Sequence, residues 1–382
     1  MKILAVYLVR KSGIQTFCEP LINYLSTKAE VDVLCDEESW LELKHIRNYY
    51  RLPFTKRMQS AYRILLDHFD STIVSDRWSK NALKMIDKDY DAVIAFVASS
   101  QLTAIIAGKY ISQQLGSKFA IYAVDAIPAP GGWIRHKYQF KAMQKVIGKV
   151  YSAADYVTAS NKHMLEYQLT QFKHKEGLMT DVLLTPAVDG YYKCVPSNEV
   201  VFLYAGALYG LRNPEHFLKA FKRLLKIYPK AEFCIVGGVC DLRNIDQILT
   251  PEERTHVVTL PRTFALEPLF ARAKVLVDID ADLEKDPFLS SKIVTYLKVN
   301  RVILSETGRI TPSREMFAGL NTVVQCDHNE ESLYQGMLRA IELADSNPDF
   351  SEREPYIESF AIDNVSEKLW CGLKKVCGVK EE

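Results

Sequence analysis

The sequence predicts an α/β protein of two domains, each built on a parallel β-sheet. Its 382 residues are more than one ordinary hydrophobic core accommodates. Short apolar, β-rich runs alternate with longer helical stretches, which is typical of parallel strands joined by helices. This alternation stops once, at "TPAVDGYYKCVPSNEV" (185–200), which is rich in turn-forming residues and indicates a linker, and then resumes.

The elements of the first half are expected before that linker. The strands are "KILAVYLV" (2–9), "EVDVLC" (30–35), "DAVIAFVA" (91–98), "KFAIYAVD" (118–125) and "YVTAS" (156–160), and the helices include 16–28 and 102–116. The second half repeats the pattern with strands at 200–206, 232–238, 256–260, 274–280, 301–306 and 321–326, and helices at 214–228, 267–273 and 290–298. We therefore expect two Rossmann-like domains, 1–190 and 191–361, that face each other across a ligand cleft at the carboxyl ends of both sheets. The amphipathic segment of about 362–382 can pack back on the first domain.

Composition excludes several classes of protein. The chain is 48% hydrophobic and 25% charged with a net charge of +1, so no global field attracts nucleic acid. The eight cysteines show neither Cys-x-x-Cys nor zinc spacing and are expected to be reduced thiols in a cytoplasmic protein. The chain starts directly with a strand rather than a signal-peptide layout, and its longest apolar run (91–108) is interrupted by polar residues. We expect a soluble protein, at most peripheral on a membrane. A dinucleotide oxidoreductase is disfavoured because the first strand–helix turn, "VRKSGIQTF" (9–17), carries Gly13 alone instead of G-x-G-x-x-G.

Two cations stand where strands end and helices begin in the second half. In "YAGALYGLRNPEHFLKAF" (204–221), Gly206 and Gly210 permit a tight turn, and Arg212 precedes Pro214 at the expected helix start, where a phosphate is favoured. The alternative is a solvent-facing arginine that covers the helix end. In "DPFLSSKIVTYLK" (286–298), Lys292 lies in the first helical turn, where the macrodipole disfavours a cation unless an anion is bound there.

The first turn of that helix offers further ligands for an anion. With Ser290 or Ser291 as N-cap it presents free backbone N–H groups, hydroxyls and the ammonium. The alternative is a lysine that extends into solvent. Together, Arg212 and Lys292 predict a diphosphate site whose charge is neutralised by the protein alone.

These segments resemble the GT-B glycosyltransferases of family 4 over most of the chain. "YAGALYGLRNPEHFLKAF" is similar to the family's strand–glycine-loop–helix, "EFCIVGG" to the next strand and its glycine turn, and "SSKIVTYLKVNRVILSETG" to the donor-binding helix and following strand. The resemblance implies donor contacts from Gly206, Arg212, Gly238, Arg262, Ser290, Ser291, Lys292 and Thr295. In the first domain, "SGIQTF" resembles the acceptor-side glycine loop, which contains Gly13. Thr295 stands where the family commonly has a ribose-binding glutamate, and the earlier glutamate falls on or beside Pro287; a hydroxyl there binds a sugar more weakly than a carboxylate does.

Carboxylates supply two further hypotheses. Asp125 ends an expected strand of the first domain and is a candidate to orient or deprotonate an acceptor hydroxyl; the alternative is a turn residue that caps "AIPAP". Asp278 and Asp280 share one face of a strand, and Asp-x-Asp can bind a divalent metal. The alternatives are solvated strand-end acids or a sugar contact, and we expect no metal.

Two stretches of the first domain combine basic and aromatic residues. Residues 40–65 contain six cations (Lys44, Arg47, Arg51, Lys56, Arg57 and Arg63) against one acid, Glu42, and residues 135–149 contain five cations and no acid. This mixture suits an anionic membrane surface or a lipid-diphosphate acceptor, and a plain solvated helix face is the alternative.

The sequence thus predicts a metal-independent hexosyltransferase that uses a UDP- or GDP-type sugar, without a cofactor, and a glycan or lipid-linked acceptor. The resemblance implies retention of stereochemistry and a role in cell-surface polysaccharide or glycoconjugate synthesis. A nucleotide-sugar epimerase of the same fold and a catalytically silent sugar-nucleotide-binding protein are the alternatives.

Overall fold

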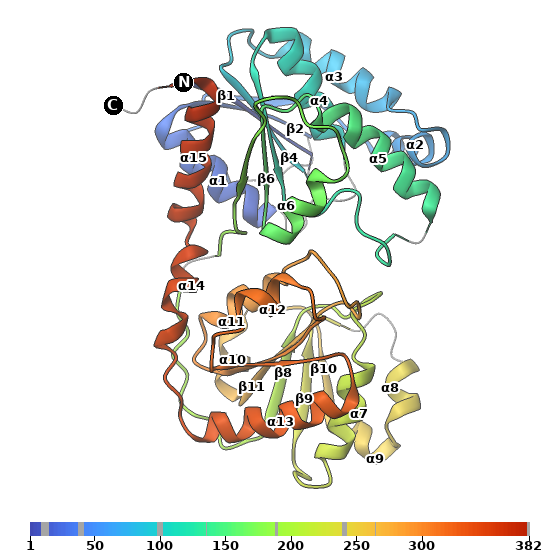
Figure 1. Cartoon of the computed structure of the whole chain (residues 1–382), viewed down its shortest axis with the longest axis vertical. Coiled ribbons are helices and arrows are strands. Elements are labelled where there is room, and N and C mark those ends of the chain that lie inside the picture. The colour runs from blue at the N-terminus through green and yellow to red at the C-terminus, as the bar shows by residue number, and fades with distance from the viewer. Residues whose placement is uncertain are drawn as a thin grey trace. The chain divides into compact units, whose positions relative to one another are not determined.

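The computed structural model describes residues 1–8, 15–36, 42–97, 102–134, 136–187, 190–238, 243–263 and 265–379 (Figure 1). Contacts divide the chain into two compact units. One comprises Met1–Ala187 together with Phe360–Glu382, and the other comprises Val188–Ser359. The chain therefore leaves the first unit, forms the second, and returns to the first.

A seven-stranded parallel sheet forms the centre of the first unit. Its strands, in spatial order, are β3 (Asn48–Arg51), β2 (Glu30–Cys35), β1 (Lys2–Tyr7), β4 (Ala92–Val97), β5 (Lys118–Ala123), β6 (Tyr156–Ala159) and β7 (Met179–Val182). The order reverses between β1 and β4, which is the pattern of a doubly wound fold. The central strands are buried on both faces, so they read in the sequence as continuous apolar runs.

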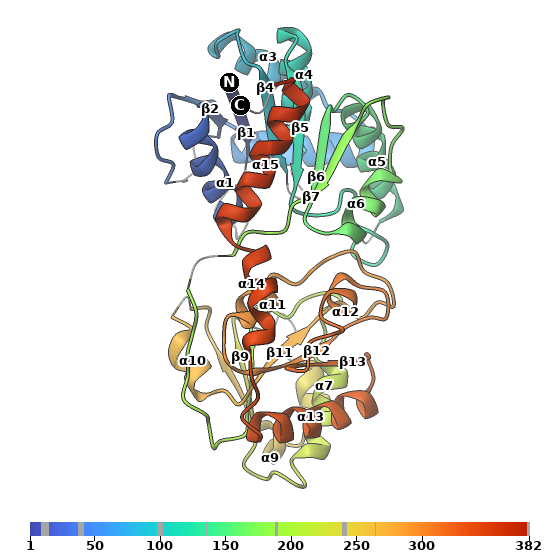
Figure 2. The same ribbon diagram turned by 60° about the vertical axis from the view of Figure 1, so that its left-hand side comes forward.

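Helices cover this sheet. They are α1 (Gln15–Lys28), α2 (Lys56–Phe69), α3 (Ile73–Met85), α4 (Thr103–Leu115), α5 (Lys137–Tyr151), α6 (Lys162–Leu169) and α15 (Ile362–Cys377). Helix α15 is the last helix of the chain, and it packs beside α1 (Figure 2). Its buried residues Val365, Leu369 and Leu373 recur every fourth position and join the core formed by α1 and the central strands.

The second unit repeats the plan with a six-stranded parallel sheet. Its order is β10 (Val257–Leu260), β9 (Glu232–Val236), β8 (Val201–Ala205), β11 (Val275–Ile279), β12 (Val302–Glu306) and β13 (Val323–Cys326). The helices are α7 (Glu215–Leu224), α8 (Arg243–Ile248), α9 (Pro251–Arg254), α10 (Glu267–Arg272), α11 (Ser291–Leu297), α12 (Pro312–Met316), α13 (Glu330–Asp345), the short 3₁₀ helix Ser351–Arg353 and α14 (Glu354–Ser359). Here the order reverses between β8 and β11.

The expected fold class is confirmed: both halves are parallel-sheet α/β domains. Two edge strands, β3 and β7, were not predicted. Both have four residues, and β3 alternates half-buried with exposed positions, so neither carries the long apolar run of a central strand. Part of the basic stretch 40–65 is therefore an edge strand rather than a helix face. No helix of the described chain is long and apolar enough to cross a bilayer.

Candidate functional site

The strand-order reversal in the second sheet brings the predicted donor residues to one place. In open α/β sheets, ligands bind outside the carboxyl ends of the strands at such a reversal. Strand β8 ends at Ala205 and leads through a glycine-containing loop into α7, whereas β11 ends at Ile279 and leads through residues 280–290 into α11. Both connections therefore start at the carboxyl edge of adjacent strands.

Two glycines let the loops approach each other closely at this edge. The N–H of Gly206 donates to the carbonyl of Val236 at 2.7 Å. A Cβ on Gly237 would lie 2.9 Å from the backbone carbonyl of Gly206, and Gly237 has φ +119°, which side chains rarely adopt. A Cβ on Gly206 would lie 2.7 Å from Cδ of Lys292, so the lysine stem passes directly over this glycine. The absence of a side chain at position 206 is what allows Lys292 to lie here.

Lys292 is paired with an acid of the protein itself. Its Nζ lies 3.4 Å from Oδ1 of Asp278 and 4.9 Å from the ring centre of Tyr204. The Lys292 side chain is only 11% exposed and that of Asp278 is fully buried. Burial lowers the pKa of Lys292, but Tyr204 and Asp278 outweigh it, so the pKa is raised and the ammonium keeps its charge. The alternative of a lysine that extends into solvent is therefore wrong, because the buried carboxylate at the end of β11 attracts the ammonium.

Ser290 forms a hydrogen bond with the same carboxylate, that of Asp278. Its hydroxyl donates to Oδ1 of Asp278 at 2.8 Å and makes no capping bond to α11, although Ser290 occupies the N-cap position. The first-turn N–H groups of α11 are thus not satisfied by that hydroxyl. Ser291, the first residue of α11, is exposed.

Arg212 lies in the loop before α7, at the same edge. Its Nη1 donates to the hydroxyl of Tyr209 at 3.3 Å. Burial lowers the pKa of Arg212, but Tyr209 and the nearby carboxylates Asp280 and Asp278 outweigh this, so the pKa is raised. The structure therefore brings Arg212 and Lys292 into one electrostatic cluster.

Asp280 completes the cluster but is held differently from Asp278. It is 3% exposed, and its Oδ2 accepts hydrogen bonds at 3.2 Å from the hydroxyls of Thr307 and Ser313. Burial, followed by the neighbouring Asp278, raises the pKa of Asp280 to about 7. The alternative of solvated strand-end acids is thus wrong for this pair, because both carboxylates are buried. Within the described ranges, no three side chains of His, Cys, Asp or Glu gather as a metal site.

The other predicted donor residues lie along the same edge of the sheet. Gly238 follows β9 with φ +97°, and Arg262 is an exposed residue after β10. Thr295 is half-buried on α11, one turn after Ser291.

The predicted acceptor-side residues belong to the first unit. Asp125 follows β5 and is half-buried. Gly13 lies outside the described residues.

The sequence did not indicate how α11 is fixed at its far end. Arg353 is fully buried and donates to the carbonyls of Val299, Arg301 and Thr322 at 2.8 to 2.9 Å. Its Nε donates to the hydroxyl of Thr322 at 2.8 Å. Since Val299 lies two residues after the end of α11, this guanidinium anchors the helix that carries Lys292. A lone arginine in a polar segment gives no sequence signal for such a role.

The two basic stretches differ in the structure. Arg47 is an internal partner, because it forms ion pairs with the buried Asp32 and with Asp87. By contrast, α2 and α5 pack against each other and carry exposed cations beside exposed apolar side chains. The exposed apolar residues of these two helices are Ile64, Phe69 and Tyr138, and the exposed cations are Lys56, Arg57, Arg63, Lys137, Lys141, Lys145 and Lys149. We call this set the α2–α5 surface.

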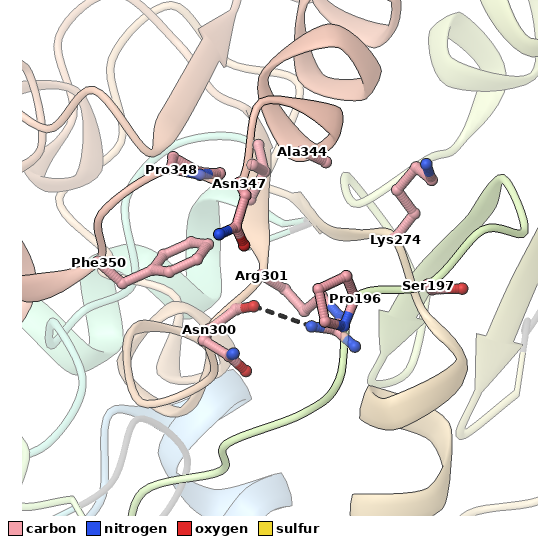
Figure 3. Close-up of a pocket in the computed structure, with 10 residues that line it drawn as sticks. Pro196, Ser197, Lys274, Asn300, Arg301, Ala344, Asn347, Pro348 and Phe350 are labelled. Atoms are coloured by element: carbon pink, nitrogen blue, oxygen red, sulfur yellow. Dashed lines mark hydrogen bonds between the residues drawn. The ribbon is translucent and has the colours of Figure 1, made fainter.

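A small pocket at the opposite, amino end of the second sheet has another character (Figure 3). Arg301 lines this pocket, and its guanidinium donates hydrogen bonds to backbone carbonyls, including those of Ala273 at 2.6 Å and Asn300 at 3.0 Å. Lys274 lines it as well and is ion-paired with Asp345. These cations are structural, and the pocket lies away from the carboxyl edge where α/β proteins bind ligands.

Solved structures similar to this chain decide the fold. The Anabaena protein HepE, solved in complex with UDP, has 14% identity and a TM-score of 0.72 over 98% of this chain and 100% of that chain. The lipopolysaccharide outer core galactosyltransferase WaaB, in its apo form, has 14% identity and a TM-score of 0.67 over 98% and 99%. The chain has the GT-B fold.

A second group of solved structures shares this fold with a different chemistry. The UDP-GlcNAc 2-epimerase from Neisseria meningitidis, bound to UDP-GlcNAc, has 12% identity and a TM-score of 0.53 over 98% of this chain and 100% of that chain. No family model and no curated protein matches the sequence. Identities of this size establish a shared architecture and leave the reaction to be argued from the site.

Proposed function

We propose that the protein is a glycosyltransferase that moves a hexose from a nucleotide diphosphate sugar to a glycan or lipid-linked acceptor. The observation that carries the proposal is the joint position of Arg212 and Lys292 at the strand-order reversal of the donor-side sheet in a GT-B fold. A solved neighbour of the same fold was crystallised with UDP, which supports a nucleotide diphosphate as the ligand.

The two cations would stabilise the leaving diphosphate. As the bond from the sugar to the diphosphate breaks, negative charge grows on the leaving oxygen, and preorganised cations in a largely buried site lower that barrier. Arg212 can present two parallel N–H groups to a phosphate, whereas Lys292 acts as a point charge over the Gly206 loop. Because the protein supplies both charges, the proposed reaction needs no metal ion.

The remaining assignments extend the family-4 resemblance. Gly206 and Gly238 would allow close backbone approach to the donor, Arg262 would lie beside the nucleotide base, and Thr295 would contact a sugar hydroxyl. Ser290 and Ser291 open the helix that faces the phosphates. Retention of stereochemistry and a role in polysaccharide or glycoconjugate synthesis belong to this part of the proposal.

The acceptor side is assigned to the first unit. Asp125 follows β5 at the carboxyl edge of its sheet, where a carboxylate can orient or deprotonate an acceptor hydroxyl. Gly13 is proposed for the same side on the family resemblance. The α2–α5 surface combines cations with exposed apolar side chains, of which Phe69 is 70% exposed. Such a surface favours a lipid-linked acceptor and peripheral contact with an anionic membrane.

Two other functions are compatible with this fold. Epimerases among the solved neighbours support a nucleotide-sugar epimerase. Thr295, in place of the family glutamate, supports a silent binding protein. Incubation with radiolabelled nucleotide sugars and product analysis separates the three. Transfer of label to an acceptor supports the transferase, an isomerised free donor identifies an epimerase, and binding without turnover identifies the silent protein.

A further inference from the structure

Two buried acids at the end of β11 are stabilised in different ways. Oδ1 of Asp278 receives the hydroxyl of Ser290 at 2.8 Å and has the ammonium of Lys292 at 3.4 Å. In the described part of the chain, the donors to Asp280 are neutral: the hydroxyls of Thr307 and Ser313. Among the ion pairs of the described chain none includes Asp280. Lys292 therefore pairs with Asp278, whereas hydroxyl groups hold Asp280 and Arg212 acts on it without an ion-pair contact.

The charges that face Asp280 come from several elements. Asp278 belongs to β11, Lys292 to α11, and Arg212 to the loop before α7, while Asp286 is a buried acid of the segment before α11. His328, which follows β13, interacts electrostatically with Asp280 and forms a hydrogen bond with Glu306 of β12 at 3.1 Å. Formally, the cations Arg212 and Lys292 balance Asp278 and Asp280. A bound diphosphate adds at least two negative charges to this balance.

We infer that binding of a nucleoside diphosphate at Arg212 and Lys292 is accompanied by uptake of one proton from solvent, and that Asp280 is the group that takes it. The proton adds to a carboxylate oxygen of Asp280 when the ligand binds and returns to solvent when it leaves. The inference rests on the proposed function, because it requires the diphosphate to bind between these two cations.

Asp280 is the group best suited to take the proton. Asp278 keeps Lys292 and Ser290, and Asp282, which lies two residues after Asp280, is 52% exposed and can be solvated. A buried carboxylate without a cation partner is costly to keep ionised, and an added anion increases that cost. In agreement with this geometry, burial first and Asp278 second raise the pKa of Asp280 to about 7, so a modest further rise converts it to the neutral acid near neutral pH.

Calorimetry with UDP and with GDP tests the inference on the full chain. Titrations at pH 8.0 in two buffers with different ionisation enthalpies give the number of protons taken up per ligand bound. The terminal phosphate of a free nucleotide is ionised at this pH, because its second pKa is about 6. Wild type should take up more than half a proton, and its apparent Kd should rise with pH above 7 by at most about tenfold per pH unit.

Three variants decide which group takes the proton. Asp280→Asn should bind the nucleotide without proton uptake and with an affinity that does not fall between pH 7 and 8.5. Asp282→Asn and His328→Gln should keep the uptake, since they alter neighbouring groups that the inference does not use. Binding without uptake in wild type, uptake that persists in Asp280→Asn, or uptake that is lost in His328→Gln would overturn the inference and leave the proposed function intact. Failure of wild type to bind either nucleotide would overturn both.

Discussion

The substitution Lys292→Met removes the ammonium but keeps most of the aliphatic stem over Gly206. Asp278 would then retain only the Ser290 hydroxyl, because its Oδ2 has no hydrogen-bond partner among the described residues. At 3.4 Å and an effective dielectric constant near 20, the lost attraction is about 5 kcal/mol. Relief of the buried lysine's own desolvation offsets part of it. We expect a net loss of about 3 kcal/mol in the free energy of unfolding, as for other broken buried pairs.

Guanidinium unfolding can locate this loss in one unit of the chain. The four tryptophans, at 40, 78, 133 and 370, all belong to the first unit, so their fluorescence reports that unit, whereas far-UV circular dichroism reports both. The loss should therefore be larger in circular dichroism than in fluorescence. Lys285→Met, an exposed position on the same segment, should change stability by less than about 0.5 kcal/mol.

A double-mutant cycle gives the decisive comparison. Lys292→Met combined with Asp278→Asn removes both charges, so the double variant should be more stable than the sum of the single losses predicts, by about 1 to 3 kcal/mol. Strict additivity, or a loss below about 1 kcal/mol for Lys292→Met alone, would show that Lys292 does not stabilise the buried carboxylate. The ion pair would then have no part in organising the site.

Three further predictions concern the buried acid, the glycine loops and the α2–α5 surface. The pKa of Asp280 in the folded chain is about 7, above its usual 3.8, so its contribution to stability is lost as pH rises from about 4 to 7. Asp280→Asn should therefore be more stable than wild type at pH 8 by roughly 2 to 4 kcal/mol. Thermal unfolding at pH 5 and at pH 8 measures this gain, which should be smaller at pH 5. Gly237→Ala should lower the free energy of unfolding by about 2 to 4 kcal/mol, since both its φ and the adjacent backbone oppose a side chain. Gly206→Ala should lower it less and should mainly weaken UDP binding. Equal losses of stability in the two variants would contradict the assigned contacts. Wild type should float with anionic vesicles and not with neutral ones, and should lose this binding at high salt, because each basic residue near the surface contributes about 1 kcal/mol. The flotation variant replaces Lys56, Arg57, Arg63 and Lys141 with glutamine. Arg47 is left out of it because its pairing with Asp32 is structural, and flotation that survives the variant would mean another surface binds.

The fold could be predicted because its information is local. Central parallel strands such as β4 and β11 are buried on both faces, so each appears as an uninterrupted apolar run between helical segments. Edge strands lack this property. β3 exposes alternate residues, and its basic and aromatic composition is equally compatible with a helix face, which is why the sequence alone did not separate the two.

The site could be predicted only in part. Arg212 and Lys292 stand out because strand ends and helix starts are marked by glycine, proline and serine. Their counter-ions do not, because the pairing of Asp278 with Lys292 depends on how the chain between β11 and α11 returns to the edge of the sheet. A macrodipole argument indicates that Lys292 needs an anion nearby, and it does not distinguish a bound ligand from an internal carboxylate.

The position of the nucleotide is the central claim, and a crystal structure of the chain with UDP or GDP bound tests it most directly. The account predicts the diphosphate at the carboxyl edge of β8 and β11, within hydrogen-bond distance of Arg212 and Lys292 and beside the first turn of α11. A nucleotide bound elsewhere in the second unit, such as the pocket lined by Lys274 and Arg301, with Lys292 still paired to Asp278 and Arg212 without a phosphate contact, would contradict it.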